Sequence, residues 1–284
     1  MSDISKLLKQ VEAYYKKEGR SHLPWRKTRD PYKILVSEVM LQQTQVERVI
    51  PFYKNFLRQF PNPKALAKAP LSKVLKAWQG LGYNRRAKYL QQAAVVLAKE
   101  GYQGYEKGQK LPGVGPYTQG AIDAFALNKP TVIIETNIRT VFLYFCFSRG
   151  MSRCHLDMGV GDAEILPLVG LALGKTKLEP REFYAALMDY GAKLKREGIK
   201  LNKQSKHYVK QGKFEGSARQ LRGAILRELL RAHEVSQTNL TLTQLTKNLS
   251  CEFNKTAEEV KRELERLQKE SLVSKSGMHW RVSQ

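Results

Sequence analysis

The amino-acid sequence predicts an all-α protein in which a larger helical body is followed by a small module of helices and one β-hairpin. Apolar residues recur at spacings of three and four along most of the 284 residues, which is the periodicity of helices with one buried face. Helix start signals precede several of these segments. A short alternating stretch near the C-terminus carries the strand-like pattern.

The helical body is expected to begin at its first residues. The periodic segments are 4–17, 31–45, 47–58, 84–98, 116–127, 136–147, 180–194 and 217–232. Asp30 and Pro31 supply an N-cap and a first-turn proline, Ser72 and Asn84 can cap two further helices, and Pro116 opens another.

A polar, basic stretch at 193–213 interrupts the periodicity and predicts a loop or linker. Helices are then expected near 241–249 and 255–270, followed by strands around the turn at Ser276 and Gly277. Helix, helix and hairpin in this order indicate a winged-helix module. A small helical tail with no role in DNA binding is the alternative.

The charge predicts a polyanionic partner. Lysine and arginine number 49 against 26 acidic residues, a formal net charge of +23. Nucleic acid is favoured over acidic lipid or a merely solvated basic face, because no lipidation motif or apolar membrane segment accompanies the charge. We therefore expect the protein to bind double-stranded DNA and not a membrane.

The N-terminal residues and the cysteines predict an intracellular protein. Residues 1–5 lack the layout of a signal peptide, and no run of eighteen apolar residues occurs. Cys146, Cys154 and Cys251 are odd in number and widely spaced, which argues against a disulfide framework and a four-thiolate metal site. We expect a cytoplasmic, nucleoid-associated protein in a reducing compartment.

A glycine loop at residues 111–115 is the first candidate binding element. Gly113 and Gly115 let the backbone approach a ligand closely, and the helix that begins at Pro116 offers free N–H groups to an anion. A DNA phosphate is the expected ligand. The alternative is a tight connection with no ligand.

Two glutamates are candidates for acid chemistry. Glu38 shares a helix face with Ile34, Leu35 and Leu41, so burial should raise its pKa. Glu135 precedes a helix start, whose N–H groups and dipole should keep it ionised. Such a pair suits cleavage of a glycosidic bond. An ordinary surface glutamate and a plain capping acid are the alternatives.

Several short segments of the sequence resemble the motifs of one known family. They are Leu23-Pro24-Trp25-Arg26, Ser37-Glu38-Val39-Met40-Leu41-Gln42-Gln43-Thr44-Gln45-Val46, Trp78-Gln79-Gly80-Leu81-Gly82-Tyr83, Leu111-Pro112-Gly113-Val114-Gly115-Pro116-Tyr117-Thr118 and Ala186-Leu187-Met188-Asp189-Tyr190-Gly191-Ala192. From about residue 20 to 192 the chain is similar to the MutY adenine DNA glycosylases of the helix-hairpin-helix superfamily. The resemblance implies a two-lobed glycosylase fold.

The resemblance also implies roles for particular residues. Glu38 matches the acid that protonates the purine, Glu135 the carboxylate that stabilises the sugar cation, and Tyr117 and Asn137 the residues that support them. Gln43 and Tyr83 match side chains that wedge into the duplex. The base pocket is expected from Trp25, Arg26 and Asp189, and DNA contacts from Leu111, Gly113, Val114, Gly115, Thr118, Lys195, Lys203 and Lys206.

One position that discriminates within the superfamily and three departures from the MutY pattern sharpen the prediction. Bifunctional relatives carry a lysine where Tyr117 stands, so a monofunctional enzyme is expected. The spacing of four cluster cysteines falls on Lys195, Asn202, Ser205 and Gln211, so we expect no iron–sulfur cluster, no other cofactor and no metal. The residues after 213 do not resemble the Nudix-like domain that reads 8-oxoguanine. Glu135 replaces an aspartate, one methylene shorter.

The sequence thus predicts a monomeric, monofunctional DNA glycosylase that removes adenine opposite guanine or 8-oxoguanine. The expected glycosylase domain covers 1–213, with a six-helix lobe at about 31–139 and a second lobe from 1–30 and 140–213, and the C-terminal module covers 214–284. Alternatives are the same fold acting on thymine, uracil or hypoxanthine, or a non-catalytic DNA-binding protein.

Overall fold

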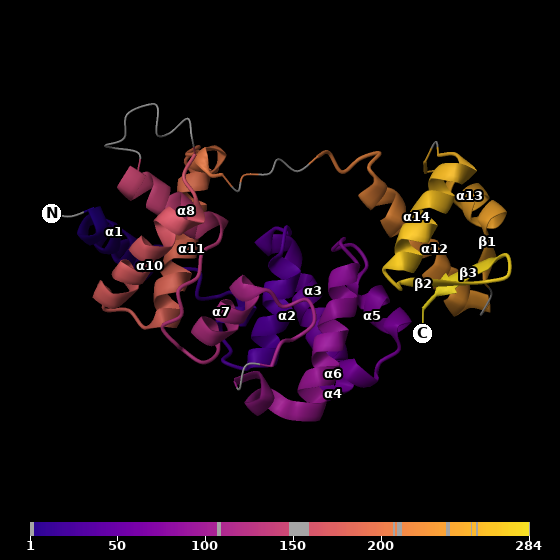
Figure 1. Cartoon of the computed structure of the whole chain (residues 1–284), viewed down its shortest axis with the longest axis horizontal. Coiled ribbons are helices and arrows are strands. Elements are labelled where there is room, and N and C mark those ends of the chain that lie inside the picture. Colours follow the sequence, from indigo (N-terminus) through magenta and orange to yellow (C-terminus); the bar gives the residue numbers. More distant parts are fainter. Residues whose placement is uncertain are drawn as a thin grey trace. The chain divides into compact units, whose positions relative to one another are not determined.

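The computed structural model describes residues 3–106, 109–147, 159–206, 208, 212–236, 239–250, 252–253 and 255–283. Helices make up most of the described chain, and a small sheet lies near the C-terminus (Figure 1). The predicted all-α class with a small C-terminal sheet is confirmed. The contacts divide the chain into two compact units, Met1–Glu38 with Gly115–Lys210 and Val39–Val114 with Gln211–Gln284.

The first unit is organised around helix α11. Its elements are α1 (Asp3–Glu18), the 3₁₀ turn η1 (Pro24–Arg26), the start of α2 (Pro31–Leu41), α7 (Pro116–Phe125), α8 (Thr136–Phe142), the π-helical turn η2 (Leu143–Phe147), α10 (Asp162–Lys175), α11 (Pro180–Arg196) and η3 (Leu201–Gln204). Helix α11 packs against α8, α1 and α7, and its buried residues include Phe183, Tyr184 and Leu187. This helix therefore supports both elements that follow the glycine loop.

The second unit packs helix α6 against α4 and α5. Its helical part comprises the end of α2, α3 (Val46–Gln59), α4 (Pro63–Lys68), α5 (Leu71–Trp78) and α6 (Arg85–Glu106). Phe56 lies with its ring 4.8 Å from that of Phe60 and 5.8 Å from that of Trp78. All three side chains are buried, so this aromatic cluster fixes the loop that follows α5.

The C-terminal part of the second unit has the element order of a winged helix. The order is α12 (Ala218–Ser236), β1 (Leu240–Thr241), α13 (Leu242–Ser250), α14 (Ala257–Lys269), β2 (Val273–Ser276) and β3 (His279–Val282). The antiparallel sheet has the strand order β1-β3-β2. Gly277, with φ 57°, makes the turn between β2 and β3, as the sequence predicts.

Most predicted helices are present, and the differences have local causes. Asp30 caps α2 by accepting a hydrogen bond from the Tyr32 N–H at 2.9 Å. The Ser72 cap is wrong, because α5 already begins at Leu71, after Pro70. Helix α10 was not expected; its segment is apolar almost all round and contains Pro167, so it lacks a helical period. In the described part of the chain no helix is both long and apolar enough to cross a membrane.

The predicted domain boundaries differ from the two units. Residues 212–283 of the described chain fall in the same unit as Val39–Val114. Lys76 pairs with Glu234 at 2.6 Å, and the Lys88 Nζ donates to the Glu270 carbonyl at 2.9 Å. The C-terminal module is therefore held against α5 and α6, and an independently folding domain at 214–284 stays a prediction.

Candidate active site

Glu38 is a buried acid on helix α2. Its side chain is 7% exposed, and it lies between the fully buried Val36 and Met40. Burial raises the pKa of Glu38 from 4.5 to about 7, the nearby charge of Glu135 adds to the rise, and a hydrogen bond from Tyr117 opposes it. The predicted rise in pKa is confirmed. A carboxyl with this pKa can hold a proton at neutral pH and give it away.

Tyr117 stands in the first turn of α7 and contacts this acid. Its hydroxyl donates a hydrogen bond to Glu38 Oε2 at 3.1 Å. Burial and the two carboxylates raise the pKa of Tyr117 well above its usual value, so the phenol remains protonated. The hydroxyl therefore serves as a fixed donor that orients Glu38.

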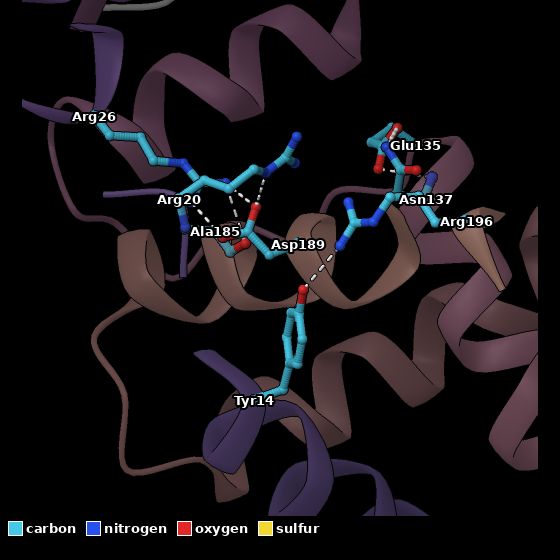
Figure 2. Close-up of polar contacts among 8 residues, drawn as sticks. All are labelled: Tyr14, Arg20, Arg26, Glu135, Asn137, Ala185, Asp189 and Arg196. Atoms are coloured by element: carbon cyan, nitrogen blue, oxygen red, sulfur yellow. Dashed lines mark hydrogen bonds and ion pairs between the residues drawn. The ribbon is translucent and has the colours of Figure 1, made fainter. Parts of the chain in front are cut away.

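Glu135 is the N-cap of helix α8. Its Oε1 accepts a hydrogen bond from the Asn137 N–H at 2.7 Å, and its Oε2 accepts one from Asn137 Nδ2 at 3.3 Å (Figure 2). Its Oε1 also accepts a hydrogen bond from the Ile138 N–H at 3.0 Å. The helix start thus holds the carboxyl through both oxygens.

The pKa of Glu135 is raised, whereas the helix N-terminus alone would lower it. Burial raises the pKa of Glu135, and the hydrogen bonds from Asn137 and Ile138 only partly counter it. The sequence argument counted the helix N-terminus and omitted the loss of water around the carboxyl. Both acids of the site thus bind protons more tightly than glutamate in water.

A close approach of two helices sets the position of α8. A Cβ atom at Gly191 on α11 would lie 2.4 Å from the Asn137 carbonyl oxygen and 2.6 Å from its Cβ. No larger residue fits there without displacing the backbone beside Glu135. Gly191 is therefore a positioning element of the site that carries no functional group.

Asp189 of α11 joins two arginines. Its buried carboxylate accepts from Arg26 Nη1 and Nη2 at 2.6 and 2.8 Å, and from Arg20 Nε and backbone N–H at 2.6 and 2.8 Å (Figure 2). Although burial disfavours the charge, the hydrogen bonds and charges of Arg26 and Arg20 lower the pKa of Asp189. Arg26 also donates to the Ala185 carbonyl at 3.2 Å.

The structure thus brings two of the three predicted base-pocket residues together. Trp25, in η1 beside Arg26, is buried. Asp189 accepts four hydrogen bonds, and those from Arg26 connect η1 to α11. A contact of Asp189 with a base stays a prediction. Arg20 was missed because its partner lies 169 residues away and no local pattern marks the pair.

The glycine loop has the geometry of a tight turn. Gly113 has φ 72°, and a Cβ there would meet the Tyr89 Cβ at 2.5 Å. The Val114 N–H donates to the Leu111 carbonyl at 3.1 Å, and Gly115 is the N-cap of α7. Leu111 and Thr118 are buried. These features fit an anion-binding turn, and DNA contact here stays a prediction.

Gln43 and Tyr83 occupy two loops of the second unit. Both are exposed and have positive φ, 56° and 48°. Arg86 belongs to the segment Arg85-Arg86-Ala87, which also resembles the family but was given no role. It joins the two loops, because it donates to the carbonyls of Val39 and Gln42 at 2.7 and 2.6 Å and of Gly82 at 3.2 Å. Burial lowers the pKa of Arg86 to about 10. The guanidinium of Arg86 thus holds both loops, each of which has a residue with positive φ.

The described part of the basic stretch after α11 packs on α8 and η2 through η3 and also contacts Val160. Ser205 forms a parallel bridge with Val160, and the Lys206 N–H donates to the Val160 carbonyl at 3.2 Å. Lys195, Lys203 and Lys206 are exposed. They are available to phosphates, and their binding to DNA stays a prediction.

The donors at the cluster positions do not fit an iron–sulfur cluster. Lys195, Asn202 and Ser205 offer an amine, an amide and a hydroxyl where thiolates are needed, and Gln211 lies outside the described residues. Among the residues that the structure describes, no group of three or more histidine, cysteine or acidic residues could hold a metal ion. A chain without a cluster stays a prediction, and no chemical step is derived through one.

Part of the chain matches a known family model. Residues 36–155 match the HhH-GPD superfamily of base excision DNA repair proteins. This segment contains Glu38, the glycine loop, Tyr117 and Glu135. Over these residues the chain is similar to the HhH-GPD superfamily of base excision DNA repair proteins.

The chain is also similar in sequence to adenine DNA glycosylases. It is 42% identical over 137 residues to an adenine DNA glycosylase of Buchnera aphidicola subsp. Baizongia pistaciae, covering 46% of this chain and 39% of that protein. It is 37% identical over 191 residues to that of Mycobacterium tuberculosis, covering 63% and 59%. The chain thus spans less than two thirds of the length of these curated relatives.

Solved structures share the fold. A thermostable thymine-DNA glycosylase superposes with a TM-score of 0.55 and 26% identity, covering 72% of this chain and 96% of that one. An endonuclease III–DNA covalent intermediate superposes with a TM-score of 0.50 at 19% identity, covering 69% and 87%. The two-lobed glycosylase fold that the sequence predicts is confirmed.

Proposed function

We propose that this protein is a monofunctional DNA glycosylase that removes adenine from mispairs with guanine or 8-oxoguanine. The observation that carries the proposal is the buried Glu38, with a pKa of about 7, beside the capped carboxyl of Glu135. The similarity to adenine DNA glycosylases supports adenine as the base. The net charge of +23 supports DNA as the polymer.

The reaction follows from the two acids. Protonated Glu38 gives its proton to a ring nitrogen of the flipped adenine, and the C1′–N9 bond breaks with its electron pair moving to the base. The sugar is left as an oxocarbenium cation, which ionised Glu135 stabilises. Water adds to C1′, and its proton passes to Glu38. The products are free adenine and an abasic site.

The side chain at position 117 supports the monofunctional assignment. A glycosylase that also cuts the strand needs an amine that forms a Schiff base with the opened sugar. Tyr117 has no amine, and its hydroxyl donates to Glu38. We expect the strand to remain intact until alkali cleaves the abasic site.

A second candidate is removal of thymine opposite guanine by the same site. The thermostable thymine-DNA glycosylase, which superposes over 96% of its own length, favours it. Glu38 favours adenine, because protonation of a ring nitrogen is a stronger requirement for a purine leaving group.

Single-turnover base release separates the candidates. Duplexes that contain A·8-oxoG, A·G, T·G, U·G or hypoxanthine are incubated with the protein and treated with alkali. We expect cleavage at the adenine mispairs and a loss of about 10²–10⁴-fold in Glu38→Gln. Release of thymine alone would establish the second candidate, and tight binding with no release would rule out an enzyme. Nicking without alkali would contradict the monofunctional assignment.

Glu135 provides the test of the second carboxyl. Glu135→Gln keeps a side-chain acceptor for the Asn137 and Ile138 N–H groups and removes the charge, so helix α8 should be retained while base release falls about 10²–10³-fold. Glu135→Asp withdraws the carboxyl by about 1 Å and should cost about a hundredfold. Unchanged rates in both variants would remove Glu135 from the reaction.

A further inference from the structure

The hairpin formed by strands β2 and β3 has an outward face that the proposed reaction does not use. Two cross-strand pairs make up this face, Ser274 with Arg281 and Ser276 with His279. Trp280 alternates with these residues along β3 and is 3% exposed, so its side chain lies on the opposite, core face. The hairpin thus presents one buried face and one face to solvent, where Ser276, His279 and Arg281 are exposed.

This outward face offers hydrogen-bond donors and no acid. The two serines supply hydroxyl groups, His279 an imidazole and Arg281 a guanidinium. The Arg281 Nε donates to Ser274 Oγ at 3.2 Å, which orients the guanidinium on the face. Residues 271–284 contain no aspartate or glutamate. A face that carries donors without acids fits the phosphate oxygens of a nucleic acid.

The tip of the hairpin is narrow and apolar. Gly277 makes the turn with φ 57°, and a Cβ there would meet no other atom closely. Met278 follows it and is 77% exposed. The Lys275 ammonium lies 5.3 Å from the centre of the Trp280 ring, so a positive charge stands close to the turn. The tip therefore combines a slender backbone, an apolar side chain and a cation.

Helix α14 of the same module is less suited to DNA, although it follows α13 where a winged helix carries its recognition helix. Its exposed acids, Glu258 and Glu265, lie three or four residues from exposed cations. These cations are Lys261, Arg262 and Lys269. At that spacing opposite charges are neighbours on the helix and offset one another, and the acids repel a phosphate. The hairpin is therefore the better surface for DNA.

The shape and chemistry of the tip fit the minor groove of duplex DNA. This groove is only about 6 Å wide, which is too narrow for a helix but open to a turn. Proteins that enter it use arginine, lysine or histidine, and many insert an apolar side chain such as methionine between base pairs and bend the duplex. The hairpin has residues of each kind at its surface: Lys275, Met278, His279 and Arg281.

We propose that the β2–β3 hairpin is a second DNA-binding site, which enters the minor groove of duplex DNA with Met278 against the base steps and with Arg281 and His279 on the flanking phosphates. The proposal rests on DNA as the polymer of the proposed function. It goes beyond that function because the hairpin binds duplex that contains no mispair and so keeps the chain on DNA between substrates. A surface of anionic lipid has the same sign of charge, and the similarity of the chain to adenine DNA glycosylases favours DNA.

The first test measures binding of the full chain to a fully paired duplex by fluorescence anisotropy at several salt concentrations. Arg281→Ala should weaken binding about 3–10-fold and make the slope of log binding constant against log salt shallower by about 1. Ser276→Glu places an acid on the outward face and should weaken binding about tenfold. The matched controls Arg262→Ala and Gln268→Glu make the same changes of charge at exposed positions of α14 and should alter binding less than about twofold.

The second test addresses the groove. Insertion of Met278 should bend the duplex, so energy transfer between dyes at its two ends should rise when the unmodified chain binds. Met278→Ala should remove most of this rise, whereas Val235→Ala on α12, at a position 79% exposed, should leave it. Netropsin, which fills the minor groove of A·T tracts, should compete with the unmodified chain for an A·T-rich duplex. Thermal unfolding checks that each variant folds.

Equal effects of the hairpin variants and the α14 variants on binding would overturn the proposal. Energy transfer that does not change on binding would overturn the minor-groove geometry. If Arg281→Ala weakens binding to phosphatidylglycerol vesicles and leaves duplex binding unchanged, the surface serves lipid and the proposal is wrong. Hairpin variants that bind paired duplex weakly, in a protein that releases no base, would leave the second site standing and reject the glycosylase. Base release by a protein whose hairpin variants bind paired duplex normally would do the reverse.

Discussion

Replacement of Glu38 by glutamine should stabilise the protein by an amount that depends on pH. The pKa of Glu38 is about 7 in the folded chain against an ordinary value of 4.5. Because the folded pKa is raised, the unfolded chain ionises first as the pH rises, and stability is lost from about pH 4.5 through pH 7. Glutamine does not titrate and escapes this loss.

The magnitude follows from the shift in pKa. Each pKa unit corresponds to about 1.4 kcal/mol, so the full shift costs about 3 kcal/mol. Part of the loss has already occurred at pH 5. Between pH 5 and pH 9 the stability of Glu38→Gln relative to the unmodified chain should therefore rise by about 2–3 kcal/mol.

Urea unfolding at the two pH values, followed by circular dichroism, measures this difference. Glu47→Gln on α3 removes an exposed carboxyl and should change stability by less than about 0.5 kcal/mol at either pH. A difference for Glu38→Gln that is equal at pH 5 and pH 9 would refute the reasoning, because it would mean that Glu38 keeps its water in the folded state.

Three further changes test the surroundings of the acid. Tyr117→Phe removes a hydrogen bond that lowers the pKa of Glu38, so the fall in base release above about pH 7 should move to higher pH. Gly113→Ala meets Tyr89 at positive φ and should cost about 2–3 kcal/mol in urea unfolding, whereas Gly115→Ala has open space and should cost under about 1 kcal/mol. Asp189→Asn leaves two arginines without their carboxylate and should cost about 3–5 kcal/mol at pH 7.

Each of these has an outcome that contradicts it. An unchanged pH profile in Tyr117→Phe would mean that the 3.1 Å contact does not influence the acid. Equal stabilities of the two alanine variants would show that the glycine loop has no strained position. The pKa of Asp189 is lowered, so its contribution is present above the unfolded pKa and lost as the pH falls. An Asp189→Asn deficit that persists in acid would point to packing instead of the ion pairs.

Features of the site that depend on neighbouring residues could be predicted from the sequence. Asp30, Glu135 and Gly277 each act within a few residues, so cap and turn signals are sufficient to predict their conformation. The rise in the pKa of Glu38 also follows from its own helix face, because burial of that face is what an apolar period predicts.

The remaining features depend on residues far apart in the chain. Arg86 reaches carbonyls 44 and 47 positions away, and Arg20 reaches Asp189 across 169 positions. No periodicity records such pairs. The pKa of Glu135 was misjudged for the same reason, since its burial is produced by tertiary packing and not by the helix that it caps.

The contact at Gly191 has a consequence for mutational surveys of this protein. A single added methyl group at Gly191 collides with the Asn137 backbone, two residues from Glu135. Loss of base release at this position would therefore resemble loss of a reacting group, although glycine has none. A survey that scores activity alone would count Gly191 among the chemical residues; one that also records melting temperature would recognise it as the spacer that lets two helices meet.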